Sequence, residues 1–123
     1  MPTREYFLEQ IEKEFSAARS ALAVGNDGKA RVCARRAAGQ ALSWYMTAIP
    51  RSWGTDAMRQ LLGAKDEPSF PAEVREAAAR LSTRISEKFT YAFATNPLDD
   101  ASLIVRHVRS LMEKGGATDV ASD

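Results

Sequence analysis

The chain has 123 residues, enough for one domain with a hydrophobic core that needs no disulfide or metal to fold. It is 45% hydrophobic and 27% charged, as in globular proteins, and its formal net charge of +1 excludes a strong overall field toward nucleic acid or membranes. One cysteine excludes an intramolecular disulfide, and one cysteine with one histidine argues against a zinc site, so we expect no metal and no cofactor.

The N-terminal segment MPTREYFLEQ has no apolar run after its charges, so it is not typical of a signal peptide. No window approaches the roughly 18 consecutive apolar residues of a membrane span. We therefore expect a cytoplasmic protein that makes no membrane contact.

Apolar spacing predicts helices throughout and no strands. A first helix is expected over residues 3–24, with Thr3 as its cap, followed by a stop at Gly25-Asn26. A second is expected over residues 28–48, with Asp27 as N-cap. The side chains on its inner face are small at the start of the helix and aromatic at its end. The small side chains are expected to let the backbone of a neighbouring helix come close.

The connection over residues 50–71 contains a short predicted helix, TDAMRQLLGA, capped by Thr55 or Asp56 and stopped by Gly63. A third long helix is expected over residues 71–91, with Glu76 placed to pair with Arg80. A fourth is expected over residues 98–114, with Asn96 of the opening "NPLD" as its cap and Gly115-Gly116 as its stop.

These elements predict an all-α fold, an up-and-down four-helix bundle with an additional short helix. The predicted domain covers residues 1–114. The small, polar segment over residues 115–123 is expected to be a flexible C-terminal tail.

Basic residues concentrate on the second predicted helix, and no Asp or Glu occurs from Gly28 through Thr55. Guanidinium groups suit bidentate pairing with phosphate, so this helix is a candidate for binding RNA, DNA or a nucleotide. The alternative is a solvated face that pairs with the acids of the first helix, within the bundle or across a dimer contact. The candidate phosphate-binding residues are Lys29, Arg31, Arg35 and Arg36.

His107 is the only ready general base near neutral pH, in the sequence IVRHVRS. A lone histidine without catalytic partners is more often a structural residue at a helix boundary. No Walker-type loop and no Rossmann fingerprint is present.

Three segments resemble the HEPN superfamily (higher eukaryotes and prokaryotes nucleotide-binding) in their order and character. They are the arginine- and alanine-rich ARVCARRAAGQALSWYM, then PAEVREAAARLSTRISEKF, then NPLDDASLIVRHVRSLME, and the likeness covers roughly residues 5–113. The resemblance implies a bundle of four or five helices that commonly forms homodimers. It also implies one of three roles: a ribonuclease of a toxin–antitoxin pair, a nucleotide-binding module, or a partner of a nucleotidyltransferase.

Nuclease members of that superfamily resemble one another in an Arg-x4–6-His pattern, which this chain lacks. The positions five to seven before His107 are Ser102, Ala101 and Asp100, and Arg106 is adjacent to the histidine. We therefore expect a non-catalytic HEPN-like module, a homodimer that binds a protein partner, nucleic acid or nucleotide through its arginine-rich helix. The alternatives are a divergent ribonuclease that uses His107 and a purely structural assembly protein.

Overall fold

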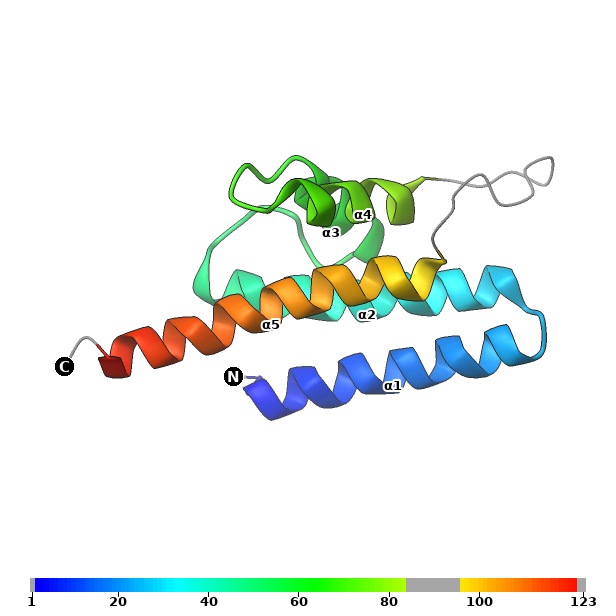
Figure 1. The fold of residues 1–123 in the computed structure, drawn as a ribbon, viewed down its shortest axis with the longest axis horizontal. Coiled ribbons are helices and arrows are strands. Elements are labelled where there is room, and N and C mark those ends of the chain that lie inside the picture. The colour runs from blue at the N-terminus through cyan, green and yellow to red at the C-terminus, as the bar shows by residue number, and fades with distance from the viewer. Residues whose placement is uncertain (1, 84–95, 122–123) are drawn as a thin grey trace.

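The computed structural model describes residues 2–83 and 96–121, with side chains up to Lys114. Every regular element in these residues is a helix, which confirms the predicted all-α class (Figure 1). The five helices are α1 (Arg4–Ala23), α2 (Asp27–Ala48), α3 (Ala57–Lys65), α4 (Ala72–Ser82) and α5 (Pro97–Ala121).

The helix starts depend on short polar side chains that accept from a backbone N–H in the first turn. Thr3 Oγ1 accepts from Tyr6 at 3.1 Å, and Asn96 Oδ1 accepts from Asp99 at 2.9 Å, as predicted. Asp56 rather than Thr55 caps α3. The prediction of Asp27 for α2 is wrong, because Asn26 accepts from the Lys29 N–H at 3.1 Å and Asp27 is already helical.

Two predicted glycine stops are wrong. A glycine ends a helix where it adopts the left-handed conformation, and the described glycines with positive φ are Gly25 and Gly54. Gly63 lies inside α3, which continues to Lys65, and α5 passes Gly115-Gly116 to reach Ala121. The flexibility of residues 115–123 remains a prediction.

The third predicted long helix is described only in part. It starts at Ala72 after Pro71, close to the predicted position, and α4 ends at Ser82. Residues 84–95, which hold the rest of the predicted helix over 71–91, lie outside the described residues.

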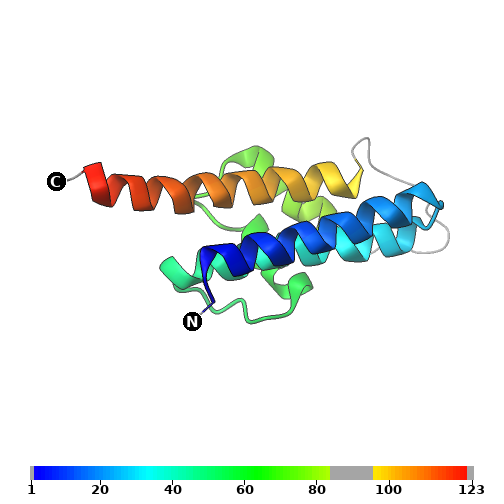
Figure 2. The same cartoon turned by 90° about the horizontal axis from the view of Figure 1, so that it is seen from below.

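α2 is the central helix of the fold. It packs against α1 on one side and against α5 and α3 on the others, while α4 joins α3 to α5. α1 runs antiparallel to α2 and α5, and it contacts α5 only slightly (Figures 1 and 2). The four-helix up-and-down arrangement is not confirmed, because α2 packs on α5, which would lie diagonally opposite it in such a bundle, while α1 contacts α5 only slightly.

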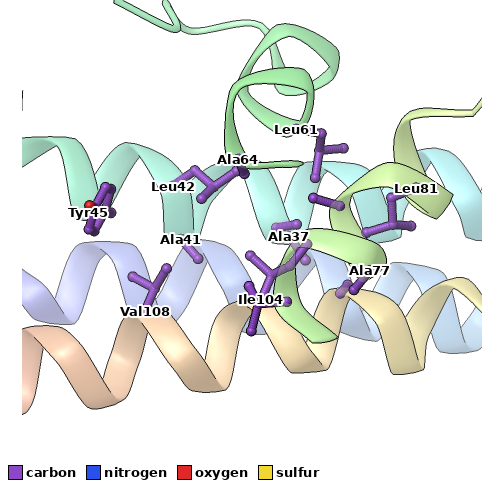
Figure 3. Packing of buried hydrophobic residues seen from close by; sticks show 14 of the residues in the cluster. Ala37, Ala41, Leu42, Tyr45, Leu61, Ala64, Ala77, Leu81, Ile104 and Val108 are labelled. Carbon is purple, nitrogen blue, oxygen red and sulfur yellow. The ribbon is translucent and has the colours of Figure 1, made fainter. Parts of the chain in front are cut away.

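The core forms where side chains from four helices meet the alanine-rich face of α2. Figure 3 shows Ala37 and Ala41 of α2 among apolar side chains of the helices that pack on it. Small side chains let helix axes approach closely, so α2 can hold three neighbours with little bulk of its own. The side chains from the neighbouring helices include Phe7, Ile11 and Phe15 of α1, Leu61 and Ala64 of α3, Ala77 and Leu81 of α4, and Ile104 and Val108 of α5.

An aromatic cluster closes the end of α2 that follows the alanines. The Tyr45 ring stacks on Trp53, with centroids 6.0 Å apart, and meets Phe70 edge-on at 5.1 Å. Gly63 lies directly under the indole of Trp53, where a Cβ would overlap the ring. Gly63 therefore allows α3 to pack close to the connection that precedes it.

We expect Gly63→Ala to lower the free energy of unfolding by about 1–3 kcal/mol, because the indole must leave its stack on Tyr45. The matched control is Gly28→Ala in the first turn of α2, where an added Cβ meets open space and no loss is expected. Urea denaturation of both variants measures the effect. Equal stability of the two variants would contradict this account of Gly63.

Candidate functional site

The first candidate site is the C-terminal end of α4, where Arg31 and Arg35 of α2 converge. Arg31 Nη2 donates to the carbonyl oxygens of Arg80 and of Thr83, the latter at 3.0 Å. Arg35 donates through Nε to the Leu81 carbonyl at 2.7 Å and through Nη2 to that of Thr83 at 3.2 Å. The two guanidinium groups thus cap the last turn of α4 from a neighbouring helix.

This capping has a plain electrostatic cause. The last carbonyls of a helix have no partner within the helix, and they form the negative end of its dipole. Arg31 is only 7% exposed, so it lies inside the fold rather than on a solvated flank. The basic residues among the alanines of α2 therefore include two that satisfy backbone groups of α4.

The same end of α4 is bound to α5 by an ion pair. Nε and Nη2 of Arg80 both donate to Oδ1 of Asp100, at 3.0 and 2.8 Å, and Asp100 is 1% exposed. The hydrogen bonds that Arg80 donates to Asp100 raise the pKa of Arg80 above its ordinary value. The predicted partner Glu76 does not hydrogen-bond to Arg80. Arg31, Arg80 and Asp100 therefore link α2, α4 and α5 in sequence.

The structure does not gather the four predicted phosphate-binding residues into one surface. Lys29 is exposed in the first turn of α2. Arg36 is exposed and lines a polar hollow of about 350 Å³ beside Glu14, Gln40 and Gln60. Only Arg31 and Arg35 lie together, and both donate to carbonyl oxygens of α4. Phosphate binding by these residues remains a prediction.

His107 is partly buried in a hollow of about 400 Å³ that Glu73, Leu103 and Arg106 also line. Its ring meets Phe70 edge-on, with centroids 5.1 Å apart, and its buried Nε2 has no hydrogen-bond partner among the described residues. Burial lowers the pKa of His107, and the charge of Glu73 opposes this effect. Among the described residues, no acid or arginine hydrogen-bonds to His107 to complete a catalytic pair.

A groove between α1 and α5 is the site that sequence reasoning missed. It encloses about 560 Å³, and its apolar lining consists of Leu8, Ile11, Phe15 and Val105. It exists because α1 and α5 both pack on α2 while they contact each other only slightly. A signal was present in the sequence, since Leu8 and Val105 adjoin the inner stripes and widen the apolar faces of both helices.

Charged side chains line the two walls of this groove. Glu12 lies on the α1 wall, and Arg106 and Arg109 lie on the α5 wall. Outside the lining, Glu113 of α5 accepts from Arg4 of α1 at 2.6 Å and from Arg109 at 2.9 Å. These two hydrogen bonds lower the pKa of Glu113, the one from Arg4 most.

No protein-family model, curated protein or solved structure matches this chain. Within residues 2–83 and 96–121, no group of three or more His, Cys, Asp or Glu side chains is placed to hold a metal. No helix in that part of the chain is long and apolar enough to cross a membrane.

We expect Arg31→Ala and Arg35→Ala each to lower the free energy of unfolding by about 1.5–3 kcal/mol, because carbonyls of α4 lose a charged donor. Arg36→Ala is the matched control on the same helix and should stay within about 0.5 kcal/mol of the wild type. Chemical denaturation at constant pH measures all three variants. Equal effects at the three positions would contradict the capping role.

We expect stability to fall as the pH drops from 7.5 to 5.5. The pKa of His107 is lowered in the fold, so the unfolded chain, with its histidine pKa near 6.5, takes up the proton first. His107→Gln should flatten this dependence, which urea denaturation at several pH values measures. Hydrogen bonds from Arg51 and Arg4 lower the pKa values of Glu67 and Glu113, respectively, so protonation of these two acids reduces stability only at lower pH. The same slope in the variant would contradict the assignment to His107.

Proposed function

We propose that this protein is a non-catalytic helical module that binds a protein partner in the α1–α5 groove. The groove itself is the observation that carries this proposal. It is the largest hollow described above, and its lining is more apolar than that of the hollow beside Arg36. Its walls carry exposed charges of both signs, which is a combination that suits protein recognition more than catalysis.

The burial of the lining residues supports a docking role. Ile11 and Phe15 at the floor are already buried by the fold. Leu8 and Val105 remain partly exposed and pack against the core from the groove side. A partner that covers these two side chains removes further apolar surface from water without disturbing the core.

The contacts of Arg31 and Arg35 favour a protein partner over phosphate. Both side chains already donate to carbonyl oxygens of α4, so a phosphate ligand would have to compete with the helix end for these donors. Binding of nucleic acid or a nucleotide through Lys29 and Arg36 is the weaker candidate, because the two side chains do not form one patch with the other arginines.

We also propose that the protein is HEPN-like, forms a homodimer and is located in the cytoplasm, as predicted from the sequence. The order of α1, α2, α4 and α5 along the chain supports the HEPN resemblance. The missing Arg-x4–6-His pattern supports the non-catalytic assignment. We also keep the up-and-down bundle within this proposal, with α3 as its additional short helix.

The proposal predicts that helical peptides selected from a displayed library on the intact protein bind at the groove. Val105→Asp should weaken the selected peptides by about tenfold or more, because it places an unpaired charge on an apolar contact. Val32→Asp is the matched control, because Val32 is an exposed valine of α2 outside the groove lining. Fluorescence anisotropy measures the affinities, and circular dichroism checks that both variants fold.

Two results would contradict this proposal. One is the absence of any enriched peptide on the folded protein. The other is a set of peptides that Val105→Asp leaves unaffected and that Arg36→Ala weakens, which would move the binding surface to α2.

A further inference from the structure

We propose that the occupant of the α1–α5 groove is an amphipathic helix of a partner protein, held with its acidic flank along α5 and its basic flank along α1. This inference rests on the proposed function and specifies the shape, charge and direction of the ligand. It follows from the backbone, the length and the two walls of the groove.

The backbone of the groove walls favours a helix over an extended peptide. An extended peptide binds by adding a strand to a sheet edge, which offers unpaired N–H and C=O groups. The groove walls come from the interiors of α1 and α5, where backbone groups are paired within each helix. The wall therefore offers side chains alone, which is the surface that an amphipathic helix recognises.

On another face, α5 already packs against an amphipathic helix of the same chain, α4. α4 packs on α5 through an apolar stripe, and the Arg80–Asp100 ion pair fixes its position. The groove lies on the face of α5 toward α1, where no described element covers it. The residues of the α4 stripe are Val74, Ala77, Ala78 and Leu81.

The length of the groove sets the length of the occupant. The lining extends from Leu8 to Phe15 on α1 and from Asp99 to Arg109 on α5. At 1.5 Å per residue these segments are about 10 and 15 Å long, or two to three helical turns. Three apolar side chains at spacings of i, i+4 and i+7 match this length.

The charges of the walls differ in sign. On α1, the exposed Glu12 is the charged residue of the lining, and the exposed Glu5 lies two turns before it, outside the lining but on the same side of the helix. On α5, Arg106 makes no ion pair among the described residues, and Arg109 pairs with Glu113. Asp99 at the far end of the α5 wall opposes this basic character only at its own position.

The pairs that these wall residues make are easily exchanged. Glu12 contacts Arg19 at 2.5 Å, and the side chains of both residues are more than half exposed. Surface ion pairs of this type contribute little to stability, so a partner's charge can replace them at low cost. Opposite charges on the two flanks of the bound helix therefore complement both walls.

This arrangement fixes the direction of the bound helix. If an amphipathic helix is reversed end for end in the groove, its apolar stripe still contacts the groove floor, but its two flanks exchange walls. The acidic flank can lie along Arg106 and Arg109 in only one of the two directions. Exchanging the flank charges in a peptide should therefore reverse its direction without changing its apolar contacts.

The test uses the full chain and two helically constrained peptides of about 18 residues with leucines at i, i+4 and i+7. One has glutamates on the first flank and lysines on the second, and the other has these flanks exchanged. Each carries a nitroxide label at its N-terminus. We expect both to bind, with the label broadening backbone amide resonances near Arg4 for one peptide and near Ala23 for the other.

A third peptide with lysines on both flanks tests the walls separately. It should bind the wild type about tenfold more weakly than either mixed peptide, because one flank faces like charge. In the Arg106→Glu, Arg109→Glu variant it should become the tightest of the three. The matched control is Lys29→Glu with Arg36→Glu, which changes the net charge equally but leaves the groove and the order of affinities unchanged.

Three results would overturn the inference. Binding that Val105→Asp abolishes but whose direction ignores the flank charges would remove the inference and leave the proposed function standing. Binding of no peptide, together with failure of the library selection, would remove both. Sedimentation that shows a dimer dissociated by Val105→Asp would make a second copy of the chain the occupant.

Discussion

The close approach of helices to the alanine face of α2 is the constraint on which the fold depends. α2 contacts α1, α3 and α5, and five of its buried residues are alanines with no exposed surface. An alanine offers little apolar area. Each contact is therefore stabilised by the many close van der Waals contacts that a short interhelical distance allows, rather than by one large side chain. The larger side chains come from the neighbouring helices and from the aromatic end of α2 (Figure 3).

Because the side chains of this face of α2 are small, they make little contact with the more distant α4, and other interactions position that helix. α4 touches α2 only slightly, and long arginine side chains from α2 cross that distance to reach its last carbonyls. A hydrophobic contact would define how closely α4 packs. Directional hydrogen bonds to consecutive carbonyls also define where α4 ends relative to α2, and Asp100 adds a constraint from α5 through Arg80.

Much of the fold could be predicted from the sequence because its determinants are local. Thr3 and Asn96 cap their helices through a side chain and an N–H only three residues apart. The cap of α2 was misplaced by one residue, since Asn26 and Asp27 are both good capping residues and the turn at Gly25 decides between them. Gly63 was misread because the same residue type serves helix ends and close packing, and only the position of Trp53 distinguishes them.

The candidate sites could be predicted less well because their determinants are distant in sequence. The spacing of Arg31 and Arg35 shows that they share a face, but the carbonyls they meet are 46 to 52 residues away. Phosphate and helix C-termini present similar negative oxygens to a guanidinium group, so composition alone does not separate them. The groove exists because no other described helix covers the apolar faces of α1 and α5 at this point. An apolar stripe in the sequence does not show which helix, if any, will cover it.

The attachment of α1 has a consequence for how the chain folds. α1 packs mainly on the helix that follows it, across a short turn at Gly25, so the two helices can pair without closing a long loop. Closing so short a loop costs little chain entropy, and a helical hairpin of low contact order forms rapidly. The capping of α4 by α2 closes a much longer loop. We therefore expect the α1–α2 hairpin to form early in folding, with the later helices condensing onto it.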